Sequence, residues 1–159
     1  MNKYIIEGIK VLVSFLLVIG LTACKREEKM ELTGTYVKTI RYDYDKYIKN
    51  LDVNEDDEEL VMTYEFDMEK GEGIMVRKGM NLCNCTATPR SKVTVEKNEI
   101  TIENVFPETG GTCNNFFDIY TKITGVEKKK YHIVILEGQF GYYKFDIDLA
   151  KETEGKYYE

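Results

Sequence analysis

Hydrophobic and polar residues alternate along most of the chain. The pattern is clearest at 60–68, where large apolar side chains occupy every second position from Leu60 to Met68. A period of two is typical of a β-strand that buries one face and exposes the other. The sequence therefore predicts a half-buried strand over 60–68.

Similar patterns predict further strands elsewhere. Runs rich in Thr, Tyr, Val and Ile are typical of strands, and short polar or glycine-containing segments separate them. Lys97-Asn98 lies between two such runs and predicts a two-residue hairpin turn. The further strands are expected at 32–42, 74–78, 92–96, 99–102, 131–136 and 143–149.

One segment has a longer period. Phe116, Tyr120 and Ile123 follow one another at spacings of four and three, and Gly125 ends the run. This spacing predicts a short helix over about 115–124, with an aromatic stripe packed on the sheet. The expected fold class is therefore α+β: a single small domain, mostly antiparallel β-sheet, with this one helix.

The first residues have the composition of a targeting segment. Lys3 and Lys10 flank the uncharged apolar run 11–21, which is shorter than the roughly 20 residues of a membrane span and suits a signal-peptide core. The run ends in Leu-Thr-Ala-Cys, which resembles a bacterial lipobox with Cys24 as the lipidated residue. An ordinary signal peptide and an uncleaved signal anchor are the alternatives.

These patterns predict the organisation of the chain. We expect a lipoprotein signal peptide at 1–23, a tether at 24–31, a β-rich domain at 32–149 and a polar tail at 150–159. Lys25 follows the cysteine in place of an aspartate, which by resemblance to lipoprotein sorting rules favours the outer membrane of the cell envelope. The charged run that begins at Lys25 fits either a surface-export signal or a solvated tether.

The charge of the chain limits its partners. With 22 basic and 28 acidic residues, the formal net charge is −6 at pH 7, so the chain should repel nucleic acid. The acyl chains on Cys24 would instead hold it to the membrane. A further partner, either an envelope protein or a small ligand, is expected but not identified by the sequence.

Three cysteines remain after Cys24 is assigned to lipid. In an exported protein, Cys113 is expected to form a disulfide with either Cys83 or Cys85, which leaves one free thiol. Three reduced cysteines, or a soft metal held by them, are the alternatives. His132, the single histidine, lies far along the chain in a predicted strand, so we expect no complete metal site.

Several short motifs resemble the META domain, a small domain common in bacterial envelope lipoproteins. They are the Cys83-Asn84 step, the Thr-x-x-x-Cys segment 109–113, the predicted helix at 116–123, the closing strand 139–149 and the opening strand 32–36. The resemblance implies the fold and an envelope location, and little about biochemistry. Leu82 replaces the family's glycine, Cys85 is additional, and the acidic stretch 46–59 lies outside the pattern. A lipocalin-like calyx is the competing fold.

Motifs of catalysis are absent from the sequence. After the signal peptide there is one serine, Ser91, and one histidine, His132, and no Gly-x-Ser-x-Gly, His-Glu-x-x-His or nucleotide-binding loop. We expect no catalytic residues, no cofactor and a binding or envelope-stress role. The alternatives are a lipocalin-like carrier of a small ligand and an immunity-type protein that binds a basic partner through 46–59.

The expected disulfide generates a stability prediction. A bridge to Cys113 closes a loop of roughly 30 residues and should stabilise the domain by about 3–4 kcal/mol. Reduction should therefore lower the melting temperature by roughly 10 °C, measured by calorimetry with and without reductant. The Cys113→Ser variant should already melt at the lower temperature, and reductant should not change its melting temperature. Equal melting temperatures for the oxidised and reduced wild-type chain would contradict the bridge.

Overall fold

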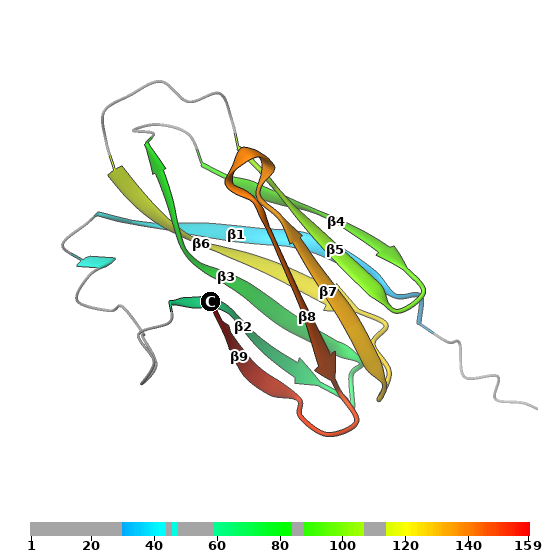
Figure 1. Cartoon of the computed structure of the whole chain (residues 1–159). Helices are drawn as coiled ribbons and strands as arrows, with labels where there is room; N and C mark the ends of the chain where they lie inside the picture. Colours follow the sequence, from blue (N-terminus) through cyan, green and yellow to red (C-terminus); the bar gives the residue numbers. More distant parts are fainter. Residues whose placement is uncertain (1–29, 44–45, 48–58, 84–87, 107–113) are drawn as a thin grey trace, which may run out of the picture.

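The structure is a computed structural model that describes residues 30–43, 46–47, 59–83, 88–106 and 114–159. Nine strands and one 3-10 turn account for most of these residues (Figure 1). In chain order they are β1 (Thr33–Asp43), β2 (Leu60–Asp67), β3 (Glu72–Cys83), β4 (Arg90–Glu96), β5 (Glu99–Val105), β6 (Asn114–Thr124), β7 (Lys130–Leu136), η1 (Gly138–Phe140), β8 (Tyr142–Asp148) and β9 (Glu154–Tyr158).

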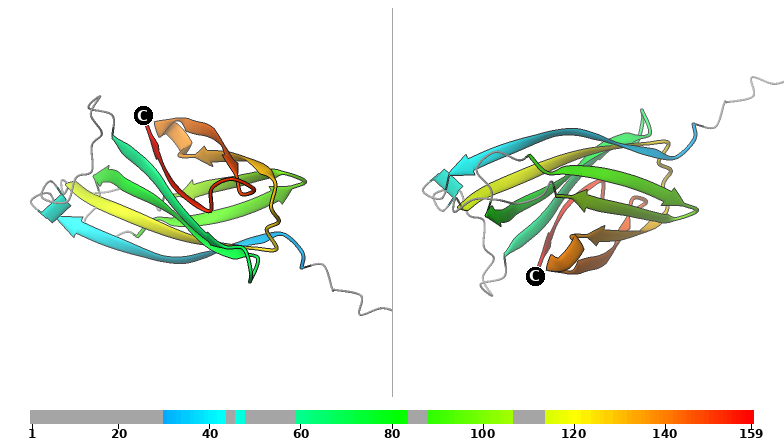
Figure 2. Two further views of the ribbon diagram at one scale, coloured as in Figure 1. Left: turned by 90° about the horizontal axis from the view of Figure 1, so that it is seen from below. Right: turned by 90° about the horizontal axis from the view of Figure 1, so that it is seen from above.

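The strands form two sheets that face each other (Figures 1 and 2). The five-stranded sheet has the order β1-β6-β3-β2-β9 and is antiparallel throughout. The four-stranded sheet has the order β4-β5-β7-β8, with one parallel pair, β5 and β7. The protein is therefore mostly β, and the prediction of a mostly antiparallel sheet is confirmed.

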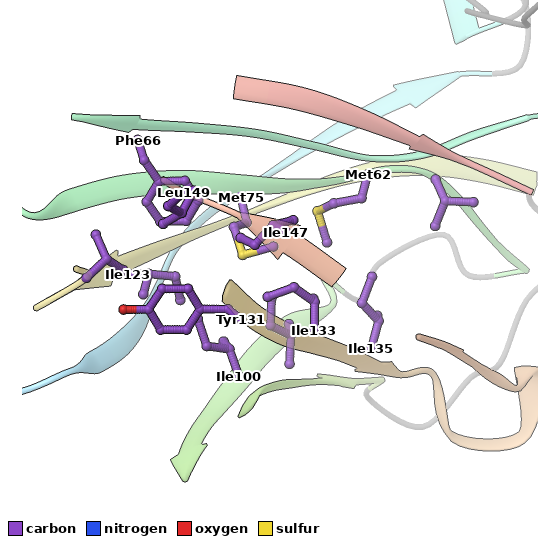
Figure 3. Close-up of a cluster of buried hydrophobic side chains, with 13 residues drawn as sticks. Met62, Phe66, Met75, Ile100, Ile123, Tyr131, Ile133, Ile135, Ile147 and Leu149 are labelled. Atoms are coloured by element: carbon purple, nitrogen blue, oxygen red, sulfur yellow. The ribbon is translucent and has the colours of Figure 1, made fainter. Parts of the chain in front are cut away.

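The core fills the space between the two sheets (Figure 3). Each strand points alternate side chains inward, as the period of two requires. Tyr131 is fully buried, and its hydroxyl accepts a hydrogen bond from the Glu127 backbone N–H at 2.8 Å. The other large side chains with almost no exposure include Met62, Met75, Ile100, Ile102, Ile123, Ile133, Ile135 and Leu149.

A buried ion pair joins the sheets within this core. Arg77 on β3 and Glu137, which follows β7, are 8% and 3% exposed. The guanidinium binds the carboxylate with two contacts, Nε to Oε1 at 2.5 Å and Nη2 to Oε2 at 3.1 Å. Asn104 on β5 donates a third hydrogen bond to Oε1 at 3.2 Å. Burial alone would lower the pKa of Arg77, but the hydrogen bonds and charge of Glu137 raise it.

The expected helix over 115–124 is wrong, because these residues form strand β6. Phe117, Ile119 and Ile123 point inward, whereas Phe116 and Tyr120 lie on the opposite face. The strand carries large apolar side chains on both faces. Some of these side chains are therefore three or four residues apart by chance, which imitates the pattern of a helix. Its position between β1 and β3 satisfies the backbone on both sides.

The segment 150–159, expected to be a polar tail, contains strand β9. This strand pairs with β2, and the backbones of Glu59 and Glu159 exchange hydrogen bonds of 2.8 and 3.1 Å. The Tyr157 ring stacks on Phe145 of β8, with ring centres 4.3 Å apart. The strand is short and half polar, as edge strands commonly are, so its sequence lacks a clear apolar alternation.

The other predicted strands are present. The segment 74–78 extends in both directions to form β3, which has twelve residues. The Lys97-Asn98 turn joins β4 to β5, with Lys97 at a positive φ of 57°. At the edge between the sheets, β1 approaches β4 so closely that a Cβ on Gly34 would lie 2.3 Å from Val93. None of the helices among the described residues is long and apolar enough to cross a membrane.

The assignment of β6 predicts losses of stability of different size at two aromatic residues of this strand. Phe117→Ala removes a ring that is 0% exposed and should destabilise the protein by about 3–5 kcal/mol. Tyr120→Ala, on the outer face of the same strand, should cost about 1 kcal/mol or less. Urea denaturation of both variants measures this difference. If the Tyr120 variant lost more stability than the Phe117 variant, the orientation of β6 would be contradicted.

Candidate binding face on the five-stranded sheet

The outer face of the five-stranded sheet carries an open hollow of about 780 Å³. The hollow crosses all five strands, and we call it the open face. A site of this shape can receive a partner from solvent without any rearrangement of the core. Its lining residues are Val37, Lys38, Thr63, Tyr64, Glu65, Ile74, Val76, Tyr120, Glu154, Gly155 and Lys156.

The floor of the open face is formed by the central strands. Met75 and Arg77 point into the core, so Ile74 and Val76 on either side of Met75 must point outward. On the neighbouring strand β6, Tyr120 lies directly opposite Val76. These outward side chains are half-buried, so they form an apolar floor in the middle of the sheet.

Charged residues occur at both ends of this floor. Lys38 on β1 pairs with Tyr120, and its Nζ lies 4.6 Å from the centre of the Tyr120 ring. At the opposite edge, Lys156 on β9 pairs with Thr63 of β2. Two residue pairs further along the same strands, Glu65 pairs with Glu154. The lining therefore combines two lysines with two glutamates and has no net charge.

Gly155 of β9 lines the edge of the hollow and makes close contact with β2. It pairs with Tyr64, and a Cβ at Gly155 would lie only 2.5 Å from the Tyr64 hydroxyl oxygen. Tyr64 points inward with Met62 and Phe66 and packs against the core, so the glycine leaves room for its ring on the inner face of the sheet. Burial, and secondarily the charge of Glu152, raise the pKa of Tyr64.

A buried carboxylate lies further along the same sheet face. Asp118 on β6 is 2% exposed and accepts hydrogen bonds from the Lys78 ammonium at 2.5 Å and the Gly79 N–H at 3.1 Å. The Tyr42 hydroxyl adds a longer contact of 3.4 Å. The register shift between Arg77 and Met80 of β3 brings the lysine and the glycine to this carboxylate. Because these donors satisfy Asp118, the cluster is structural.

Tyr47 packs beside this cluster. Its ring stacks on Phe116 with 3.9 Å between ring centres, and its hydroxyl donates to Glu59 at 2.7 Å. Burial first, and then the hydrogen bond to Glu59, raise the pKa of Tyr47. Gly79 has a φ of +60°, and a Cβ there would collide with the Tyr47 hydroxyl at 2.1 Å. The glycine is therefore required both by its backbone conformation and by the tyrosine above it.

The outer face of the four-stranded sheet has a different character. Asp146 on β8 binds the Lys130 ammonium at 2.6 Å and His132 Nδ1 at 2.5 Å. All three side chains are 43–59% exposed. Hydrogen bonds to Lys130 and then to His132 lower the pKa of Asp146. Such exposed ion pairs contribute little to the free energy of unfolding and are typical of an ordinary solvated face.

The residues singled out from the sequence are only partly described. Cys24, Cys85 and Cys113 lie outside the described residues, as does most of the acidic stretch 46–59. Cys83 is the last residue of β3, and its backbone pairs with Asn114, the residue that follows Cys113. The disulfide to Cys113 therefore stays a prediction, as does lipidation of Cys24.

Ser91 and His132 lie on different strands and do not contact each other in the described part of the chain. Ser91 on β4 donates its hydroxyl hydrogen bond to Asn104 at 3.0 Å, whereas His132 lies on the outer face of β7. Within the described ranges, no group of three or more His, Cys, Asp or Glu side chains is arranged to hold a metal ion. The geometry that stands out is the open face, which the sequence analysis missed.

Comparison with protein-family models, curated proteins and solved structures gives no match for this chain. The resemblance to the META domain therefore stays a prediction. The helix that it implied at 116–123 is part of strand β6, so one element of that resemblance is corrected.

Proposed function

We propose that this protein is a non-enzymatic lipoprotein of the cell envelope that binds another envelope component through its open face. The observation that supports this most directly is the contrast between the two outer faces. One sheet presents a hollow of about 780 Å³ with an apolar floor, and the other presents exposed ion pairs. Binding sites commonly combine apolar surface with a few polar groups, and the open face has this combination in a shallow form.

The proposed anchor is the lipid on Cys24. The described chain begins at Met30 and enters β1 at Thr33, so the segment between the lipid and the sheet spans roughly 30 Å at most when fully extended. A domain on such a short tether stays close to the bilayer. Its open face would then meet components of the same membrane or of the layer next to it, in the outer membrane if Lys25 acts as the sorting signal.

The two alternative functions have less support. A carrier of lipocalin type needs a deep apolar cavity, and in the described part of the chain the space between the sheets is filled by core side chains. An immunity-type protein would use the acidic stretch 46–59, of which only Lys46, Tyr47 and Glu59 are described. No observation on the described residues favours either alternative over binding through the open face.

Site-specific photocrosslinking in living cells tests this function. A photoreactive residue at Val37, which is 47% exposed beside the hollow, should form a discrete adduct with an envelope component. The matched control is Tyr142, which is 64% exposed on the four-stranded sheet and should form none. Adducts of equal yield at both positions, or none at Val37, would contradict the proposed binding face.

A further inference from the structure

The open face offers a partner only side chains. Strands β6, β3 and β2 are each paired on both sides, so their backbone groups are already used in the sheet. At the β1 edge, Gly34 packs against Val93 of β4, which hinders addition of a further strand. A partner that lies across the middle of this face is therefore held by side chains, because an added β-strand, a common mode of peptide recognition, could join only at an outer edge such as that of β9.

The shape of the hollow favours a chain over a compact ligand. It is open to solvent and crosses five strands, which at about 4.8 Å between neighbours gives a length of roughly 19 Å. A compact ligand on such a surface would leave most of its own area in water. An extended oligomer that lies across the strands can contact the whole floor from Val37 to Lys156.

The chemistry of the lining combines apolar surface with both donors and acceptors. Ile74 and Val76 provide the floor and Tyr120 an aromatic ring. Lysine ammonium groups donate hydrogen bonds, glutamate carboxylates accept them, and the Thr63 and Tyr120 hydroxyls do both. Sugar units match this combination, because each ring has an apolar C–H face and hydroxyl groups around its edge. Aromatic rings in binding sites commonly pack against such apolar faces and keep their polar tips hydrogen-bonded.

The charge balance narrows the class of partner further. The chain as a whole has a net charge of −6, yet the lining carries Lys38 and Lys156 against Glu65 and Glu154. A polyanion would be repelled by the two glutamates and by the net negative charge of the whole chain. A polycation would be repelled by the two lysines. The lining thus complements an uncharged partner.

From this geometry we propose that the partner of the open face is a neutral glycan chain. This inference rests on the proposed function and specifies its ligand. Sugar rings lie over Val76 and Tyr120 across the strands, and their hydroxyls bond to the charged groups at both ends. Lys38 covers the Tyr120 ring in the free protein and, as an exposed flexible side chain, moves aside when a sugar ring takes its place.

The test is binding of oligosaccharides to the lipidated protein in nanodiscs. An array of neutral and anionic glycans is screened first, and neutral tetrasaccharides are then titrated by calorimetry. We expect saturable binding of neutral chains. Tyr120→Ala should weaken it at least tenfold, about 1.4 kcal/mol, and Lys156→Ala several-fold. The control Tyr142→Ala, on the other sheet, should bind as the wild type, and melting temperatures verify that each variant is folded.

The possible outcomes separate this inference from the function on which it rests. Binding of anionic glycans alone, no glycan binding, or neutral binding that Tyr120→Ala leaves unchanged would each overturn the glycan proposal. If Val37 still forms its specific adduct in cells, and that adduct is a protein or a second copy of this chain, the binding face stands and only the ligand class is wrong. Loss of both the adduct and the glycan binding would overturn both proposals.

Discussion

The buried ion pair of Arg77 and Glu137 fixes how the two sheets meet. Removing two charges from water costs several kcal/mol for each ion, and this cost is recovered only if the partners meet with good geometry. Here the two groups make a bidentate contact, and Asn104 satisfies the same carboxylate. An arrangement of the sheets that separated β3 from the end of β7 would leave both charges buried without a partner. Apolar packing supplies most of the stabilisation, and the ion pair selects the alignment.

The inward direction of Arg77 also determines what the outer face of the sheet presents. Because alternate residues of a strand point in opposite directions, an inward Met75 and Arg77 leave Ile74 and Val76 outside. The shift in register after Arg77 then supplies Lys78 and Gly79 to Asp118 and makes room for Tyr47. The apolar floor and its polar surroundings are thus consequences of how the core is aligned, and the proposed binding function uses a surface that the core defines.

Much of this fold could be predicted from the sequence, and the failures have physical causes. Strands such as β2 have one apolar and one polar face, so their alternation is visible in the sequence. Strand β6 is central and carries Phe116 and Phe117 on opposite faces, which hides the period of two. Strand β9 is stabilised by pairing with β2 and by the Tyr157–Phe145 stack, which are contacts between distant segments. The open face could not be predicted either. It combines outward-pointing residues from five strands, and the sequence does not reveal the order of these strands in the sheet.

The most direct test of this account is the intact mass of the protein extracted from the membranes of its own cells. The account predicts a chain that begins at Cys24 and carries diacylglycerol and acyl groups on that residue, because the proposed binding role depends on a short membrane tether. A chain cleaved elsewhere, or one beginning at Cys24 without lipid, would contradict the anchored envelope protein described here.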